Sequence, residues 1–167
     1  TLYDLIAVQK GSLLINMDAQ APNKAAYEWL AQGSLGKFTL IKPETTYQNS
    51  RFDFYLEKGS KKAFLEVKGV TLEKDGVVSF PDAPTERGVK HIEELIACHR
   101  EGYGAYLLFV IQMEPIEYFR PNWETHPAFA EALVQAKAAG VKLLAYACHV
   151  TPTSMTITDK VKIKLQL

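Results

Sequence analysis

Two carboxylates and a lysine, Asp53, Glu66 and Lys68, are the residues of this chain whose types and spacing best suit chemistry. Asp53 lies in one apolar run, and Glu66 and Lys68 lie in the next, with a single residue between them. This Asp…Glu-X-Lys pattern is typical of a metal-dependent nuclease core. The chemistry would be hydrolysis of a phosphodiester, in which negative charge accumulates on the phosphoryl and leaving oxygens and a cation stabilises it.

The segment between the two runs predicts a β-hairpin that brings these side chains together. Residues 57–62 are polar and contain Gly59, which is typical of a hairpin turn. A turn centred just after Gly59 places Asp53 opposite Glu66, and opposed residues share a sheet face with Cβ atoms about 4.5–5.5 Å apart. Lys68 is two residues beyond Glu66 and therefore shares that face.

The predicted site would hold Mg²⁺ or Mn²⁺, because such ions prefer carboxylate and carbonyl oxygens. Asp53 and Glu66 would be the carboxylate ligands, and the carbonyl of Val67 would complete the set. Lys68 would orient the attacking water or stabilise developing negative charge. Glu44 is a further catalytic candidate, for a second ion or a metal-bound water. The alternative is that Glu66 and Lys68 form an ordinary surface pair on the wet face of a hairpin.

Basic residues near the motif are candidates for contacts with nucleic-acid phosphates. Arg87 and Lys90 fall in the first turns of a predicted helix, whose N-terminus favours anions, and Arg51 is the candidate closest to the hairpin aspartate. His91 is either a phosphate contact or proton donor, or a helix-surface histidine with neither role. Asp82 either reaches the metal as an accessory residue or serves the turn between two prolines.

The elements that must position these residues alternate between strands and helices. Strands are predicted over residues 2–8, 12–15, 50–56, 63–70, 105–113, 141–150 and 154–165. Short apolar segments occur at 35–41, ended by Pro43, and at 77–80. Helices are predicted from an Asn23 cap to residue 32, from a Thr85 cap to about residue 101, and over 127–139.

The pattern as a whole predicts an α/β fold, a mixed β-sheet flanked by helices. The nearly continuous apolar run 105–113 is typical of a central strand covered on both faces. In the helix after Thr85, Val89, Ile92, Leu95 and Ile96 should face the sheet, while Arg87, His91 and Glu94 lie on another face. The 167 residues suit a single nuclease-like domain, with N-terminal strands and a helix over 1–33 and a catalytic-type core over 34–167.

Composition places the chain among folded globular proteins, with 47% hydrophobic and 23% charged residues and a net charge of zero. This overall charge balance does not predict a polyanion partner, so any contact with nucleic acid would depend on local patches. Two groups of lysines, at 58, 61 and 62 and at 160, 162 and 164, could form such patches. The interpretation we favour is that they lie in solvated loops and strand edges. No apolar run suits a membrane span and no signal peptide is evident. Cys98 and Cys148 are better interpreted as buried reduced thiols than as zinc ligands with the histidines that follow them, so the cytoplasm is the expected location.

Three longer blocks resemble a known family. They are residues 50–54, the run Glu66-Val67-Lys68-Gly69-Val70-Thr71-Leu72, and Phe80-Pro81-Asp82-Ala83-Pro84-Thr85-Glu86-Arg87-Gly88-Val89-Lys90-His91, with 140–146 fitting as well. Together they closely resemble the bacterial and archaeal sugar fermentation stimulation protein A family over nearly the whole chain. The resemblance implies a restriction-endonuclease-like PD-(D/E)XK core. In full-length members a small OB-type barrel precedes this core, and we expect that barrel to be absent here.

The resemblance also implies roles and partners. Members are described as DNA-binding proteins linked to regulation of sugar (maltose) metabolism, with nuclease activity inferred from fold and motif. By position, Glu44, Asp53, Glu66 and Lys68 match the active-site residues of that inference. Members often read Glu-Val-Lys-Tyr where this chain has Glu-Thr-Thr-Tyr at 44–47, and the stretch 16–23 is longer than usual. Many nucleases of this superfamily dimerise, which makes a homodimer an expectation.

The sequence therefore favours a metal-dependent nuclease acting on nucleic acid, with DNA the expected substrate. The alternative is a non-catalytic DNA-binding transcriptional regulator that retains a nuclease fold. The two differ in whether Asp53 and Glu66 bind a divalent ion productively. Grouping two carboxylates favours catalysis, since their approach is unfavourable without a cation.

Overall fold

The computed structural model of the chain describes residues 7–166. Its elements, in chain order, are β1 (Ala7–Lys10), β2 (Leu13–Asn16), α1 (Ala21–Ala31), β3 (Leu40–Tyr47), β4 (Ser50–Lys58), β5 (Lys61–Val70), β6 (Leu72–Lys74), β7 (Val77–Phe80), α2 (Glu86–Arg100), β8 (Gly104–Ile111), β9 (Tyr118–Pro121), α3 (Pro127–Ala139), β10 (Lys142–Thr151), β11 (Ser154–Lys160) and β12 (Lys162–Ile163). No helix among these residues is long and apolar enough to cross a membrane.

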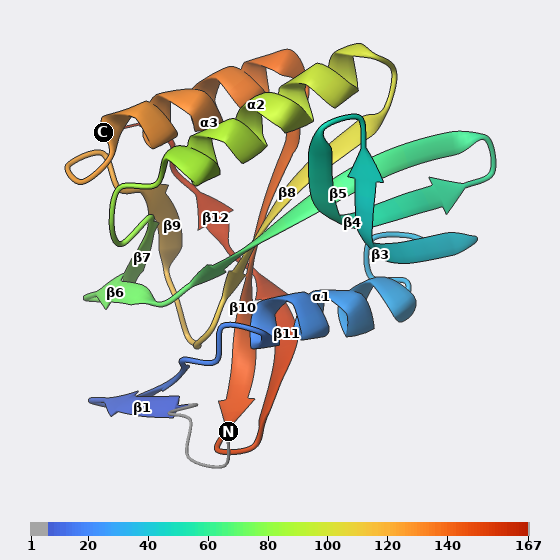
Figure 1. The fold of residues 1–167 in the computed structure, drawn as a ribbon. Coiled ribbons are helices and arrows are strands. Elements are labelled where there is room, and N and C mark those ends of the chain that lie inside the picture. The colour runs from blue at the N-terminus through green and yellow to red at the C-terminus, as the bar shows by residue number, and fades with distance from the viewer. Residues whose placement is uncertain (1–6, 167) are drawn as a thin grey trace.

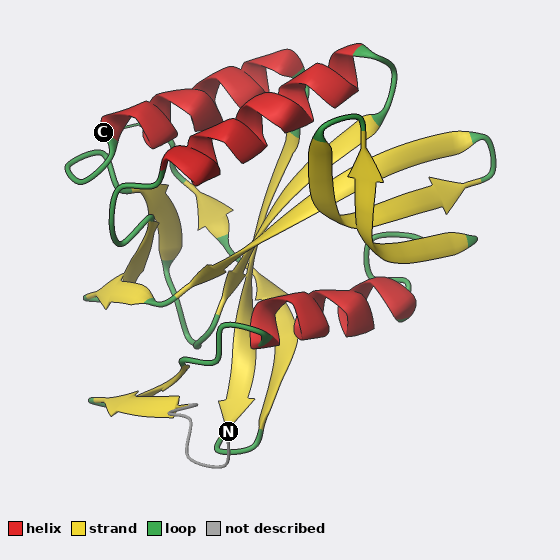
Figure 2. Cartoon of the chain, viewed as in Figure 1, coloured by secondary structure: helices red, strands yellow, loops and turns green. Residues whose placement is uncertain are grey.

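A six-stranded mixed sheet forms the centre of the molecule, in the order β11-β10-β8-β5-β4-β3. Strands β3, β4 and β5 pair antiparallel, whereas β5, β8 and β10 pair parallel. Helices α2 and α3 lie on one face and α1 lies on the other (Figure 1). A four-stranded sheet, β12-β9-β7-β6, and the β1–β2 hairpin complete the fold (Figure 2). The predicted mixed α/β fold with flanking helices is confirmed.

Burial explains why this order is stable. Strand β8 runs through the interior, and its side chains from Leu107 to Ile111 are 0% exposed. The α2 residues Ile92 and Leu95 are equally buried against that face, as the helical spacing predicts. On the other face, Trp29 and Leu30 of α1 pack in a second apolar cluster. Each sheet face is therefore covered, which a central strand without polar alternation requires.

The hairpin and the long helix agree with the sequence predictions. The β4–β5 ladder pairs Phe54 with Leu65 and Lys58 with Lys61, which is the register expected for a turn after Gly59. Helix α2 follows Thr85, whose side-chain oxygen accepts a hydrogen bond from the Gly88 amide at 3.0 Å. Both cysteines are free and buried, as predicted.

Three element predictions need correction. Helix α1 begins at Ala21 rather than at an Asn23 cap, because Pro22 has a backbone conformation suited to the first helical turn. The apolar segment at 35–41 is not ended by Pro43, because strand β3 runs through this proline to Tyr47. An edge strand such as β3 tolerates proline, since its outer edge pairs with no other strand and needs no main-chain amide there.

The C-terminal prediction also changes, since 154–165 is two short strands in different sheets, β11 and β12. Strands β6 and β9 were not predicted. They are short, and β9 takes its place only by pairing with the distant strands β7 and β12. Most of the predicted strand 2–8 lies outside the described residues.

Candidate active site

The antiparallel ladder opens where the motif carboxylates lie. Pairing between β4 and β5 ends at Phe54 and Leu65, and pairing between β3 and β4 omits Asp53. Phe52 and Phe54 pack into different core clusters, so the alternation of side chains also breaks at Asp53. The sheet therefore presents main-chain groups here that its own ladder does not use.

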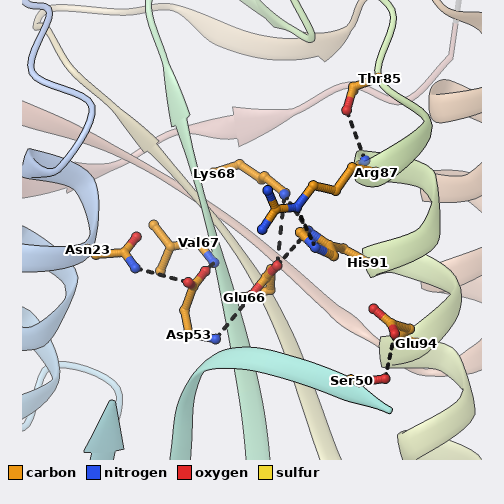
Figure 3. A network of polar contacts seen from close by, with 11 residues as sticks. Asn23, Ser50, Asp53, Glu66, Val67, Lys68, Thr85, Arg87, His91 and Glu94 are labelled. Atoms are coloured by element: carbon orange, nitrogen blue, oxygen red, sulfur yellow. Dashed lines mark hydrogen bonds and ion pairs between the residues drawn. The ribbon is translucent and has the colours of Figure 1, made fainter. Parts of the chain in front are cut away.

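Carboxylate oxygens bind these main-chain groups. Glu66 Oε1 accepts the Asp53 amide at 3.1 Å, and Asp53 Oδ2 accepts the Val67 amide at 2.7 Å. Each strand thus satisfies an amide of the other with a side chain instead of a carbonyl. Asp53 and Glu66 lie next to each other for this reason (Figure 3), although the regular ladder that the sequence predicts through this position ends at Phe54 and Leu65.

Helix α1 fixes the second oxygen of Asp53. Asn23 Nδ2 donates to Asp53 Oδ1 at 3.0 Å. The first turn of α1 can approach β5 closely because residue 69 is glycine: a Cβ there would lie 2.7 Å from Pro22 Cγ and 2.5 Å from Gln112 Oε1. The glycine that ends the Glu-X-Lys-Gly motif therefore allows the helix to reach the carboxylate.

Helix α2 fixes the second oxygen of Glu66. His91 Nδ1 lies 2.7 Å from Glu66 Oε2 and 2.7 Å from Lys68 Nζ, while Lys68 Nζ is 3.8 Å from Glu66 Oε2 (Figure 3). One ring nitrogen can donate to Glu66 or accept from Lys68, so the histidine proton decides which contact is made. Arg87 Nε lies 3.5 Å from the other ring nitrogen.

The two carboxylates have opposite pKa shifts. Burial raises the pKa of Asp53 to about 6, with a further rise from Glu66, while the Val67 amide and Asn23 oppose it. Burial also opposes ionisation of Glu66, but hydrogen bonds with His91 and Asp53 and the charges of His91 and Lys68 lower its pKa overall. Burial lowers the pKa of Lys68, although both carboxylates oppose this. Without a cation, Asp53 is therefore the member of the pair that takes up a proton first as the pH falls.

These residues border a cleft of about 670 Å³ between β4 and α2. Its lining consists of Glu44, Asn49, Arg51, Phe52, Asp53, Glu66, Glu86, Arg87, Lys90, His91 and Glu94. Seven of the residues singled out from the sequence as site candidates thus meet at one cleft. Lys68, Val67 and Asp82 are not among its described lining residues. Lys68 contacts His91 and Glu66, which do line the cleft, and Asp82 is exposed in the connection before α2.

The outer candidates interact with one another. Arg51 forms an exposed ion pair with Glu44, with Nη2 and Oε2 3.1 Å apart. Glu44 has a left-handed backbone with φ of 50°, at the point where the β3–β4 ladder is interrupted. Such a conformation is uncommon outside glycine and often marks a functional site.

The sequence did not identify every residue of the site. Asn23 was interpreted only as a helix cap, because nothing local indicates that α1 crosses to Asp53. Asn49 and Glu86 carried no signal of their own. Glu94, which accepts a 2.6 Å hydrogen bond from Ser50, was predicted to share a helix face with His91, and this spacing was the available signal.

The donor set suits a hydrated cation. Within residues 7–166, no three His, Cys, Asp and Glu side chains gather closely enough to hold an ion by themselves. Asp53 and Glu66 instead offer two adjacent carboxylates beside an open cleft. Mg²⁺ is bound in this way in many proteins, by one or two carboxylates together with waters and substrate phosphates.

The protein is thus of the mixed α/β class, with two adjacent carboxylates at a cleft and a lysine that contacts one of them. The particular family follows from comparison with known proteins. Residues 20–154 match the family model described as the sugar fermentation stimulation protein RE domain, SfsA. The chain belongs to this SfsA family, and the resemblance found in the sequence is confirmed.

Similar proteins and a solved structure agree with this family assignment. A sugar fermentation stimulation protein homolog of Desulfitobacterium hafniense strain Y51 is 58% identical over 165 residues, covering 99% of this chain and 72% of the relative. The homolog of Clostridium beijerinckii is 55% identical over 166 residues, covering 99% and 74%. The solved structure of Pyrococcus furiosus SfsA in complex with Ca²⁺ is 26% identical with a TM-score of 0.85, covering 96% of this chain and 71% of that one.

Proposed function

We propose that this protein is a metal-dependent nuclease that hydrolyses phosphodiesters of nucleic acid, most readily DNA, in the cleft between β4 and α2. The observation that carries the proposal is the adjacency of Asp53 and Glu66, held by main-chain amides in place of a ladder. A buried like-charged pair costs free energy that a bound cation would recover. Mg²⁺ or Mn²⁺ would be held by these two carboxylates.

Each residue of the site would have a distinct role. When bound, the cation would polarise the phosphate and lower the pKa of water. Asp53 and Glu66 hold their oxygens in fixed directions, because Asn23, His91 and main-chain amides contact them. Arg87 and Lys90, exposed on the cleft side of α2, bind the substrate's phosphates. The ammonium group of Lys68, which contacts Glu66 and His91, would stabilise the negative charge that develops on the reacting phosphate.

A relative supports the choice of a cation. Pyrococcus furiosus SfsA, which has the same fold by its TM-score of 0.85, was solved in complex with Ca²⁺. Calcium binds oxygen ligands, as magnesium does. The carboxylate pair of this chain offers ligands of that kind.

Cleavage of labelled single- and double-stranded DNA and RNA in Mg²⁺ or Mn²⁺ tests the proposal. The chain should cut at least one substrate, and Asp53→Ala and Lys68→Ala should each lose the activity. The exposed β11 carboxylate offers a matched control, so Asp159→Ala should cut normally. If the chain binds Mg²⁺ but cuts no substrate, or if Asp53→Ala cuts as fast as the parent, the proposal fails.

One observation favours the alternative of a non-catalytic DNA-binding regulator, which the family resemblance links to sugar (maltose) metabolism. Lys68 Nζ contacts His91 and does not line the cleft. A regulator would bind DNA with equal affinity in Asp53→Ala and would cut no substrate in any metal.

A further inference from the structure

A second hollow lies at the tip of the β4–β5 hairpin, away from the cleft. Its volume is about 550 Å³, and it is lined by Phe38, Leu56, Lys58, Ser60, Lys61, Lys62, Ala63, Glu101, Gly102, Tyr103, Gly104 and Tyr106. Figure 1 shows this tip and the C-terminal end of α2 at the same side of the molecule. The hollow is therefore formed by the tip of the β4–β5 hairpin, the connection that follows α2 and the start of β8.

Positive charge gathers at this hollow. Lys58, Lys61 and Lys62 are exposed around it, and Lys58 Nζ reaches over Gly36, beside exposed Lys37. Within residues 7–166, none of these four lysines forms an ion pair with a carboxylate. Their ammonium groups are available to an anionic partner.

The two acids at this end are engaged elsewhere. Glu57 accepts a hydrogen bond from Tyr55 at 2.5 Å, and Glu101 accepts one from Tyr47. Among the described residues, neither carboxylate forms an ion pair with these lysines. The net charge around the hollow is positive, although the chain as a whole has no net charge.

Aromatic rings accompany the lysines. Tyr103, Tyr106 and Phe38 line the hollow and are partly exposed, and Lys142 lies over the Tyr106 ring, 5.7 Å from its centroid. Surfaces that bind single-stranded nucleic acid combine positive charge with rings on which bases stack. The rings also pack against the two core clusters, so they are held in place at the base of the lysines while part of each remains exposed.

The separation of the two sites suits one strand of nucleic acid. From Asp53 to Lys58 the chain advances five strand residues, roughly 17 Å at 3.3 Å per residue. From His91 to Glu101 the helix advances ten residues, about 15 Å at 1.5 Å per residue. Successive phosphates of one strand advance by at least about 3.4 Å along a nucleic acid, so this separation corresponds to at most about five nucleotides.

We propose that the hairpin tip is a second phosphate-binding surface, which holds nucleic acid within about five nucleotides of the cleft. This inference rests on the proposed function, since it extends the same substrate beyond the cleft. An acidic protein would satisfy the lysines but would not use the exposed rings, so nucleic acid is the favoured partner.

The test compares the triple variant Lys58→Gln/Lys61→Gln/Lys62→Gln with a variant of equal charge change, Lys160→Gln/Lys162→Gln/Lys164→Gln. Fluorescence anisotropy would measure binding of 4- and 20-nucleotide DNA in Ca²⁺ over a range of salt. The tip variant should bind the 20-mer at least tenfold more weakly and the 4-mer unchanged. Its salt dependence should decrease by about 2 to 3 in slope, the value for three lost phosphate contacts. The control variant should bind both as the parent does.

Equal binding of the 20-mer by tip variant and parent would overturn the proposal, as would equal losses in both triple variants. Binding of poly-L-glutamate without binding of DNA would overturn it in favour of an acidic protein partner. Failure of the nuclease proposal is distinguishable, because lysine-dependent DNA binding would then persist while no variant cuts DNA in Mg²⁺ or Mn²⁺.

Discussion

At its tip the β4–β5 hairpin is a regular antiparallel ladder, from the Phe54–Leu65 pair to the Lys58–Lys61 pair, whereas at Asp53 the ladder stops and carboxylates replace main-chain partners. The tip carries exposed lysines without ion pairs among the described residues. The other end buries its charges, and Glu66 is only 3% exposed. One hairpin thus contains both a locally determined region and a region that depends on two helices.

The difference shows how a sheet can be opened to hold charge. A buried carboxylate is costly unless it is hydrogen-bonded. Here the interrupted ladder supplies amides, α1 supplies Asn23 and α2 supplies His91. The opening that weakens the sheet is therefore the same feature that makes room for two carboxylates. Substitutions at the two ends of the hairpin should therefore have different effects on the protein.

The largest effect should come from Glu66→Gln, with Glu57→Gln on the same hairpin as its matched control. Glutamine keeps Oε1 for the Asp53 amide but removes the charge that would hold a cation. We expect cleavage to fall by roughly a hundredfold to a thousandfold, as for loss of an electrostatic catalytic group. Glu57 lies towards the tip, bonded to Tyr55, so its variant should cut normally. Equal losses in both would mean that the two ends of the hairpin do not differ in function.

The next effect concerns stability and has a defined sign. Burial raises the pKa of Asp53 to about 6 from an ordinary 3.8. Because the folded state favours the protonated form, this group's contribution is fully present below pH 3.8 and is lost as pH rises through 6. Asp53→Asn mimics the protonated acid and should therefore stabilise the metal-free protein at pH 8, by up to about 3 kcal/mol.

Denaturant unfolding in EDTA at pH 4 and pH 8 measures this effect, with exposed Asp159→Asn as the control. The gain from Asp53→Asn should nearly vanish at pH 4, and Asp159→Asn should change little at either pH. Added Mg²⁺ should stabilise the parent and not Asp53→Asn. A loss of stability at both pH values would mean that the hydrogen bonds to Val67 and Asn23 outweigh burial of the charge.

The same contrast explains what the sequence could predict. The tip register followed from Gly59 and the polar turn, because hairpin pairing is a local property. The adjacency of Asp53 and Glu66 followed from that register. The interruption of the ladder did not, since alternation of apolar residues predicts continuous pairing through Phe52 and Phe54.

Contributions from distant elements were harder to predict. The Thr85 cap and helical spacing located α2 and its cleft-facing side, which contains His91. No local pattern connects Asn23 to Asp53, thirty residues away, because that contact depends on how α1 crosses the sheet. The contact of Lys68 with His91 depends on tertiary packing that a strand pattern does not determine.

Asn23→Ala should have a moderate effect on the cleft alone. Its amide holds Asp53 Oδ1 at 3.0 Å, and removing a group that orients a metal ligand typically costs tenfold to a hundredfold in affinity. We expect about tenfold weaker Mg²⁺ binding by isothermal titration calorimetry. Gln20→Ala, just before the same helix, is the control and should bind normally. Unchanged affinity in Asn23→Ala would mean that the Val67 amide suffices to orient Asp53.

The smallest effect should come from Thr85→Ala at the start of α2. The variant removes the 3.0 Å cap to the Gly88 amide and should destabilise the protein by about 1 kcal/mol. Thr85→Ser keeps the hydroxyl and should retain most of that stability. Hydrogen exchange should become faster in the first turn of α2, which carries Arg87 beside the cleft, and stay unchanged at Lys61 and Lys62. Equal acceleration at both places would mean that cleft and tip open together as one cooperative unit rather than as two regions of different local stability.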